Sequence, residues 1–220
     1  MQDLTAILYT ANTIPAEFAL ATHRTLMDAL QRSDSIGLMT IAIEEGVKPS
    51  HLGIYRQALQ GARQAVTKYI ALCEDDVLYS PEHFKYRPSA GVFAYNMNAW
   101  NIYTWTDPMF TQKPGGRKNL NGLICERELF IEAMEERFAK WPDDDKVDTT
   151  IWGEPGKYEG YLGVTKRSFE EFHTNPPNII FSHENELSFA GLGKRKKLGQ
   201  IRATEIPYWG TAKQIRELYQ

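Results

Sequence analysis

Residues 69–76 read Tyr-Ile-Ala-Leu-Cys-Glu-Asp-Asp, a short apolar run that ends in three consecutive carboxylates. The apolar part is typical of a buried strand. Toward the N-terminus, apolar runs at 4–9 and 36–43 predict two more strands, and helices are expected after Pro15 and Ser50. Strands and helices alternating in this order predict an α/β fold, with a Rossmann-like, mostly parallel sheet flanked by helices.

The second half of the chain has a different pattern. Aromatic-rich strands are expected at 91–95 and 99–105, a helix around 129–138, and a last strand at 179–181. Beyond them lies a basic segment, residues 191–220, with little periodicity. Because no repeat or linker interrupts the sequence, we expect one domain over residues 1–220.

Composition excludes several classes of protein. Hydrophobic residues make up 42% and charged residues 24% of the 220 residues, which is typical of a globular domain. The net charge of −3 provides no overall field that attracts a polyanion. Cys73 and Cys125 form no disulfide framework or metal motif, and we identify no signal peptide or membrane-length apolar run. We therefore expect a cytoplasmic protein without membrane insertion.

The acidic turn is the main candidate site. Glu74 and Asp76 are two residues apart at a strand end, so their side chains can lie on one side of the chain. Paired carboxylates of this kind suit Mg²⁺ or Mn²⁺, which keep some water and bind a substrate diphosphate. A solvated turn would show the same spacing. His183, after another expected strand, is a further candidate ligand, although a lone histidine is more often structural.

Two segments resemble a known family. Residues 73–84 read Cys-Glu-Asp-Asp-Val-Leu-Tyr-Ser-Pro-Glu-His-Phe and resemble the metal-binding segment of small phage and bacterial glycosyltransferases with the GT-A fold, which carry an E-x-D form of the D-x-D motif. Residues 177–183 read Pro-Asn-Ile-Ile-Phe-Ser-His and resemble the strand of that family that leads into a metal-binding histidine. Glu184 stands where the family usually has glycine, and Ala11 where it usually has an acidic residue.

The resemblance implies a GT-A-like fold and a nucleotide-sugar donor, such as a UDP-sugar. It assigns the metal and the diphosphate to Glu74, Asp76 and His183, with Mn²⁺ or Mg²⁺ as the cofactor, and the donor sugar or ribose to Asp75. The first-strand loop and one helix would face the nucleotide, through Thr10, Ala11, Asn12, Tyr55 and Gln57. Lys194 and Lys196 lie in a basic run that would hold the leaving diphosphate or nucleic-acid phosphates, unless it is simply solvated.

An inverting transferase also needs a carboxylate that takes the proton of the acceptor. Glu154 is the first candidate, because a Gly-Glu-Pro-Gly turn restrains its backbone, and Asp148 is the second unless it is an N-cap. A retaining reaction would not need this base. Trp100 and Trp105 are candidates for an acceptor-stacking wall, and Asn119 for a loop that closes over the acceptor, but a core or turn role fits each of them too.

The acceptor is open at the level of sequence. A hydroxymethylated pyrimidine in phage DNA is one hypothesis, motivated by the basic segment and the aromatic second half. A saccharide or lipid-linked acceptor is the alternative. Two other function classes remain: a non-catalytic protein that binds nucleotide sugars, and a metal-dependent phosphoesterase or nuclease. The sequence gives no oligomeric state.

Overall fold

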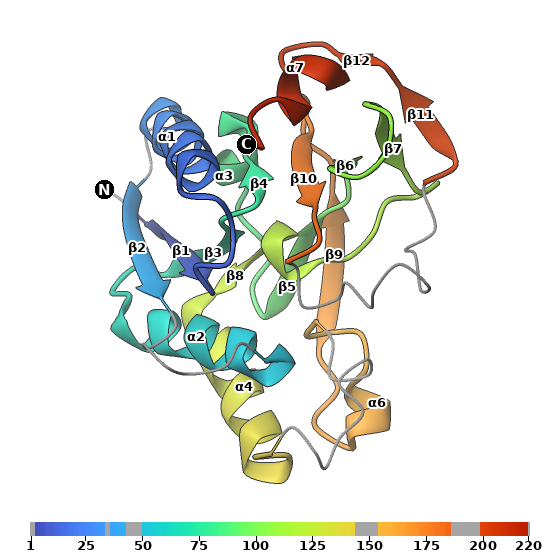
Figure 1. Cartoon of the computed structure of the whole chain (residues 1–220). Coiled ribbons are helices and arrows are strands. Elements are labelled where there is room, and N and C mark those ends of the chain that lie inside the picture. The colour runs from blue at the N-terminus through green and yellow to red at the C-terminus, as the bar shows by residue number, and fades with distance from the viewer. Residues whose placement is uncertain (1–2, 34–35, 43–49, 144–153, 186–198, 220) are drawn as a thin grey trace.

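The computed structural model describes residues 3–33, 36–42, 50–143, 154–185 and 199–219 (Figure 1). Its main sheet has six strands in the order β2-β1-β3-β8-β5-β9. The pairs β2–β1, β1–β3 and β5–β9 are parallel, and β8 runs antiparallel to both neighbours. In sheet order, the strands span Ile36–Ala42, Leu4–Thr10, Tyr69–Glu74, Leu123–Glu126, Val92–Asn96 and Ser168–Phe172.

A second sheet of five strands has the order β11-β7-β6-β10-β4. These strands span Ile201–Ala203, Phe110–Gln112, Ala99–Tyr103, Asn178–Ser182 and Val77–Leu78. A small third sheet pairs β12 with β13, which span Glu205–Ile206 and Gly210–Thr211. The helical elements are α1 Ala16–Arg32, α2 His51–Gln64, α3 Pro81–Lys85, the 3-10 turn η1 Leu120–Gly122, α4 Arg127–Lys140, α6 Glu159–Leu162 and α7 Ala212–Arg216.

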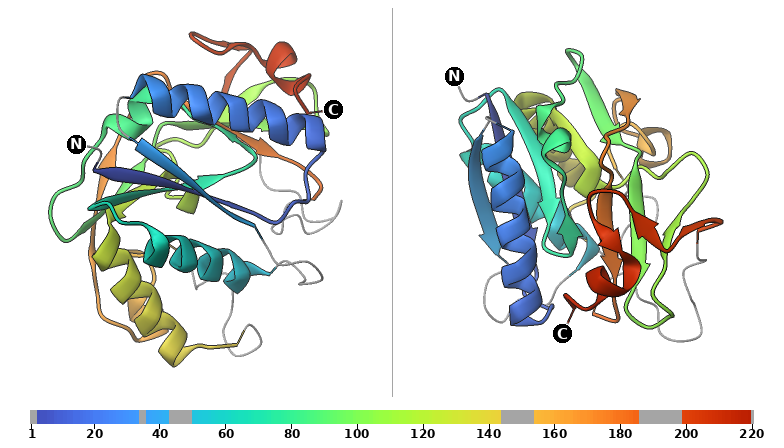
Figure 2. Two further views of the ribbon diagram at one scale, coloured as in Figure 1. Left: turned by 90° about the vertical axis from the view of Figure 1, so that its left-hand side faces the viewer. Right: turned by 90° about the horizontal axis from the view of Figure 1, so that it is seen from above.

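Helices cover both faces of the main sheet. Figure 2 shows α1 on one face and α2 with α4 on the other. A core that includes Leu8, Leu26 and Phe84 lies on the α1 side, and one that includes Ile7 and Met134 lies on the other side. The expected α/β class, with parallel strands flanked by helices, is therefore confirmed, although the sheet is mixed.

The first five elements lie where the sequence predicts them. Helix α1 follows Pro15, and the side chain of Ser50 caps α2 by accepting a hydrogen bond from the backbone N–H of Gly53 at 3.0 Å. At Gly61, α2 comes so close to β1 that an added Cβ would lie 2.4 Å from Cγ2 of Ile7. This contact holds α2 close against the sheet.

The expectation for the end of the chain is wrong. Residues 179–181 do not form the last strand, and residues 199–219 are not without pattern: they contain β11, β12, β13 and α7. A capping box begins α7, where Thr211 accepts from the N–H of Gln214 and the Gln214 side chain accepts from the N–H of Thr211. The strands have only two or three residues, too few to show a period.

His83 joins the two sheets. Its buried ring accepts hydrogen bonds at Nδ1 from the side-chain amides of Asn96 in β5 (3.2 Å) and Asn178 in β10 (3.3 Å). Burial lowers the pKa of His83 to about 3, because the imidazolium form would lose its hydration. The neutral ring is therefore the form that the fold contains.

Acid should destabilise the protein through His83. In the unfolded chain the imidazole of His83 binds a proton below about pH 6.5, whereas in the folded protein it does so only below about pH 3. Between these values the free energy of unfolding therefore falls by about 1.4 kcal/mol for each pH unit of acidification. His83→Gln removes this contribution, so the gap in unfolding free energy between wild type and variant should narrow from pH 7 to pH 4.5. Urea unfolding of both proteins at several pH values measures this difference. A difference that stays the same at every pH would contradict the role of His83 in the loss of stability.

Candidate functional site

The carboxyl ends of β1 and β3 meet at the acidic turn. The hydroxyl of Thr10, the last residue of β1, donates a hydrogen bond to Oδ2 of Asp75. Asn12 has a φ of 53° and donates its backbone N–H to the same hydroxyl at 2.9 Å. The two segments that the sequence predicts at one edge of the sheet thus lie in contact.

Glu74 points to the opposite face of the sheet from Asp75. Its carboxylate accepts a hydrogen bond from the Tyr9 hydroxyl at 2.8 Å and one from the Asn121 side chain at 2.5 Å. Sequence reasoning does not predict either residue as a partner of Glu74. Neither contact has a local signal, since the partners are 65 and 47 positions apart in the sequence.

Asp76 and His183 form the other part of the site. Strand β4 follows Asp76 and pairs with β10, and the Phe181 N–H donates to the Asp76 carbonyl at 2.9 Å. This pairing brings Nε2 of His183 to 3.4 Å from Oδ2 of Asp76. The other side-chain atoms, Oδ1 of Asp76 and Nδ1 of His183, are buried and have no hydrogen-bond partner within the part of the chain that the structure describes. Such buried atoms are costly unless a ligand satisfies them.

The three carboxylates repel one another in a poorly solvated place. Burial raises the pKa of Glu74 to about 8, and the charge of Asp76 adds to this, while hydrogen bonds from Asn121 and Tyr9 oppose it. Burial and then Asp76 raise the pKa of Asp75 to about 6, against the effects of Thr10 and His183. A bound cation would remove the repulsion.

The residues fit a cation only in part. Within the described residues, no group of three or more His, Cys, Asp or Glu side chains is arranged to hold a metal ion. Glu74 is engaged by Tyr9 and Asn121, which leaves Asp76 and His183. One or two protein ligands are enough for an ion that keeps its water and binds substrate phosphates. Asp76 and His183, whose side chains approach to 3.4 Å, are residues of the types that such an ion binds.

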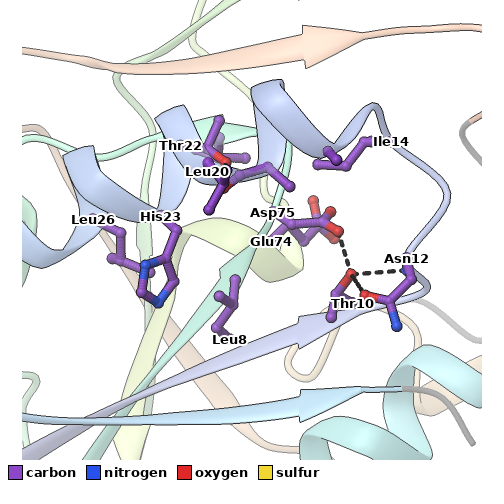
Figure 3. A pocket seen from close by; sticks show the side chains of 13 residues that line it. Leu8, Thr10, Asn12, Ile14, Leu20, Thr22, His23, Leu26, Glu74 and Asp75 are labelled. Atoms are coloured by element: carbon purple, nitrogen blue, oxygen red, sulfur yellow. Dashed lines mark hydrogen bonds between the residues drawn. The ribbon is translucent and has the colours of Figure 1, made fainter.

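A cavity of about 640 Å³ lies between α1 and the strand ends (Figure 3). Its walls are mostly apolar, and Thr10, Asn12 and Asp75 lie together at one end, with His23 farther along α1. A volume of this size accommodates a small organic molecule. The remaining lining residues are Leu8, Ile14, Ala16, Ala19, Leu20, Thr22, Leu26, Glu74 and Val77.

Two of the expected donor residues have structural contacts. The side-chain amide of Gln57 donates to the carbonyls of Thr10 (2.9 Å) and Ile41 (3.1 Å), so it ties β1 to β2. Tyr55 is buried in the core between α2 and the sheet. Ala11 lies next to Thr10 in the loop and is partly exposed. Lys194 and Lys196 lie outside the described residues.

Glu154, the candidate base, forms an ion pair with Lys157 at 3.0 Å. Burial raises the pKa of Tyr55 and of Tyr95, and the charge of Glu154 raises both further. The charge of Glu74 also raises the pKa of Tyr55. Glu154 and Glu74 therefore act on the same buried phenol. Asp148 lies outside the part of the chain that the structure describes.

The expected aromatic wall is divided between different layers. Trp100 packs against the core of the second sheet, and the Trp105 ring meets Tyr103 edge to face at 5.2 Å between centroids. Tyr95 belongs to the core beneath the main sheet. The Asn119 carbonyl accepts the N–H of Gly122 at 3.0 Å in the turn that leads to Asn121.

Comparisons with known proteins give similarity of shape alone. No family model and no curated protein matches the sequence. Among solved structures, a glycosyltransferase involved in glycosylation of the major capsid of PBCV-1 has a TM-score of 0.47 at 10% identity, covering 80% of this chain and 92% of that chain. A mutant of Drosophila β-1,4-galactosyltransferase 7, in complex with manganese, UDP-Gal and xylobiose, has a TM-score of 0.45 at 12% identity. This match covers 80% of the present chain and 69% of the galactosyltransferase chain.

A nucleotidyl transferase from Methanothermobacter has a TM-score of 0.42 at 10% identity, covering 78% of this chain and 88% of its own. Because all three scores are below 0.5, no conclusion about the chemistry of this chain follows from them. No helix among the described residues is long and apolar enough to cross a membrane.

Removing one charge should stabilise the metal-free protein. Asp76→Asn relieves the repulsion on the two buried neighbours, so unfolding in EDTA at pH 8 should require about 1 kcal/mol more than in wild type. Urea unfolding measures the change. Asp28→Asn, at an exposed ion pair on α1, is the matched control and should stay within about 0.5 kcal/mol. An Asp76→Asn protein less stable than the control would contradict this account.

Proposed function

We propose that the chain is a metal-dependent glycosyltransferase that moves a sugar from a nucleotide-sugar donor, such as a UDP-sugar, to an acceptor hydroxyl. The observation that carries the proposal is the pair Asp76 and His183 at an acidic turn beside a cavity, where Oδ1 of Asp76 and Nδ1 of His183 are buried and have no hydrogen-bond partner among the described residues. The resemblance of residues 73–84 and 177–183 to GT-A glycosyltransferases supports the same reading.

In this proposal, Asp76 and His183 hold Mn²⁺ or Mg²⁺. The ion supplies positive charge against the negative charge that develops on the leaving diphosphate. Asp75 accepts hydrogen bonds from the hydroxyls of the sugar or ribose, and Thr10 holds its carboxylate in place. Glu74 remains bonded to Tyr9 and Asn121, which hold the first residue of the acidic turn in place. The loop Thr10–Asn12 borders the cavity that receives another part of the substrate.

Thermal unfolding with a panel of nucleoside diphosphates and nucleotide sugars tests the donor site. With Mn²⁺, one nucleotide should raise the melting temperature of wild type and of Asp28→Asn but not of Asp76→Asn. At about 100 times the dissociation constant, the ligand adds about 2.7 kcal/mol. No shift in wild type with any nucleotide would contradict the proposal. A shift equal in all three proteins would place the site elsewhere.

The role of Glu154 separates a transferase from a binding protein. Glu154 takes the acceptor proton in the proposed inverting reaction, so Glu154→Gln should bind donor normally and lose about 10² to 10⁴ of the transfer rate. Glu135→Gln, at an exposed ion pair with Arg63, is the control. Transfer at the wild-type rate in Glu154→Gln would exclude this base. Donor binding without transfer in wild type, with every acceptor tried, would identify a nucleotide-sugar binding protein.

The acceptor is proposed on sequence grounds alone. Hydroxymethylated pyrimidine in duplex DNA is the first acceptor to test with radiolabelled donor, and saccharides are the second. Label on hydroxymethylated DNA, and none on unmodified DNA of the same sequence, would support the first.

A further inference from the structure

The C-terminal residues of the structure return to the site. In Figure 1, the end of the red segment lies next to β4, β10 and α1. Ile206, Ala212 and Ile215 belong to the core of the second sheet, and Leu218 and Tyr219 pack against it. The Trp209 side chain donates to the Pro177 carbonyl at 2.7 Å, which fastens the segment beside the start of β10.

The ring of Tyr219 lies between a helix and the site. It stacks on the imidazole of His183, with 5.4 Å between centroids and 28° between planes. It also meets Phe18 of α1 edge to face at 4.9 Å. The His183 ring is therefore held on one side by Tyr219, while its Nε2 faces Asp76.

Packing does not explain the hydroxyl of Tyr219. Two of its neighbouring rings, Phe18 and Phe181, have no polar group, and phenylalanine would keep these contacts and the stack on His183. Among the described residues the hydroxyl oxygen is buried and makes no hydrogen bond, and the Asn185 side chain lies near it. Burying an unsatisfied hydroxyl costs stability. The oxygen therefore marks a place for a ligand atom.

Three buried polar atoms of this cluster have no hydrogen-bond partner among the residues that the structure describes: Oδ1 of Asp76, Nδ1 of His183 and the Tyr219 hydroxyl. Asp76 is near enough for its charge to act on the phenol, as is the charge of Glu184. A divalent cation with a diphosphate would supply partners of the right kind for these atoms, since a carboxylate oxygen binds metal and an imidazole N–H or a hydroxyl donates to a phosphate oxygen.

We propose that Tyr219 belongs to the site, where its ring positions His183 and its hydroxyl donates a hydrogen bond to an anionic oxygen of the diphosphate. This inference rests on the proposed function. It adds a residue for which the sequence has no signal, because the contact with His183 is aromatic stacking across 36 positions.

Two substitutions separate the ring from the hydroxyl. Tyr219→Phe keeps the stack, so Mn²⁺ affinity should be unchanged and affinity for the nucleoside diphosphate should fall about tenfold, the loss of one hydrogen bond to a charged group. Tyr219→Leu should lower both affinities. Isothermal titration with Mn²⁺, and then with the diphosphate in excess Mn²⁺, measures them. Tyr161→Phe, at an exposed tyrosine on α6, is the control and should equal wild type.

A ligand-free measurement keeps the two proposals distinct. In histidine-labelled protein, the His183 Hε1 resonance should carry the ring-current shift of Tyr219, keep it in Tyr219→Phe, and lose it in Tyr219→Leu. The role of Tyr219 would be overturned if Tyr219→Leu bound both ligands with wild-type affinity, or if the His183 resonance were the same in Tyr219→Leu as in wild type. Wild type that binds neither Mn²⁺ nor any diphosphate would instead overturn the proposed function, and with it the role of the hydroxyl.

Discussion

Asp75 and Asp76 carry the chain from β3 in the six-stranded sheet to β4 in the five-stranded sheet. The junction between the two sheets is therefore made of carboxylates, and it is poorly solvated on both sides. The neighbours limit the repulsion in different ways. Thr10 binds Asp75 on one face of the main sheet, Tyr9 and Asn121 bind Glu74 on the other, and His183 approaches Asp76 from β10.

Each of these partners has its place because of the topology. Tyr9 and Thr10 are consecutive, so they project to opposite faces of β1 and reach carboxylates on opposite faces of β3. β10 pairs with β4, and this pairing brings His183 next to the turn. The site thus uses both sheets, and neither sheet alone would complete it.

The sequence predicts the first half of the fold well, because long periodic segments such as those of α1 and α2 determine their own structure. It misses β7, β8 and β9 and the structure after residue 199, where strands of two to five residues depend on partners far along the chain. For the site, Thr10 and Asp75 are predictable because each lies at the carboxyl end of a parallel strand. The partners of Glu74 and the stacking of Tyr219 on His183 arise from tertiary packing, which leaves no local pattern. The metal ligands and the base stay predictions.

Helix α1 makes structural contacts on more than one side. Phe18 contacts Tyr219 and Phe181, while Leu20 and His23, only two and five positions later, line the cavity. A surface helix normally has an exposed face on which substitutions are neutral, so the residues on that face change readily over evolutionary time. In α1 much of that freedom is lost between residues 16 and 26. Across natural variants of this protein, the helix should thus diverge more slowly than α4, and changes at its cavity positions should accompany changes in the molecule that the cavity accepts.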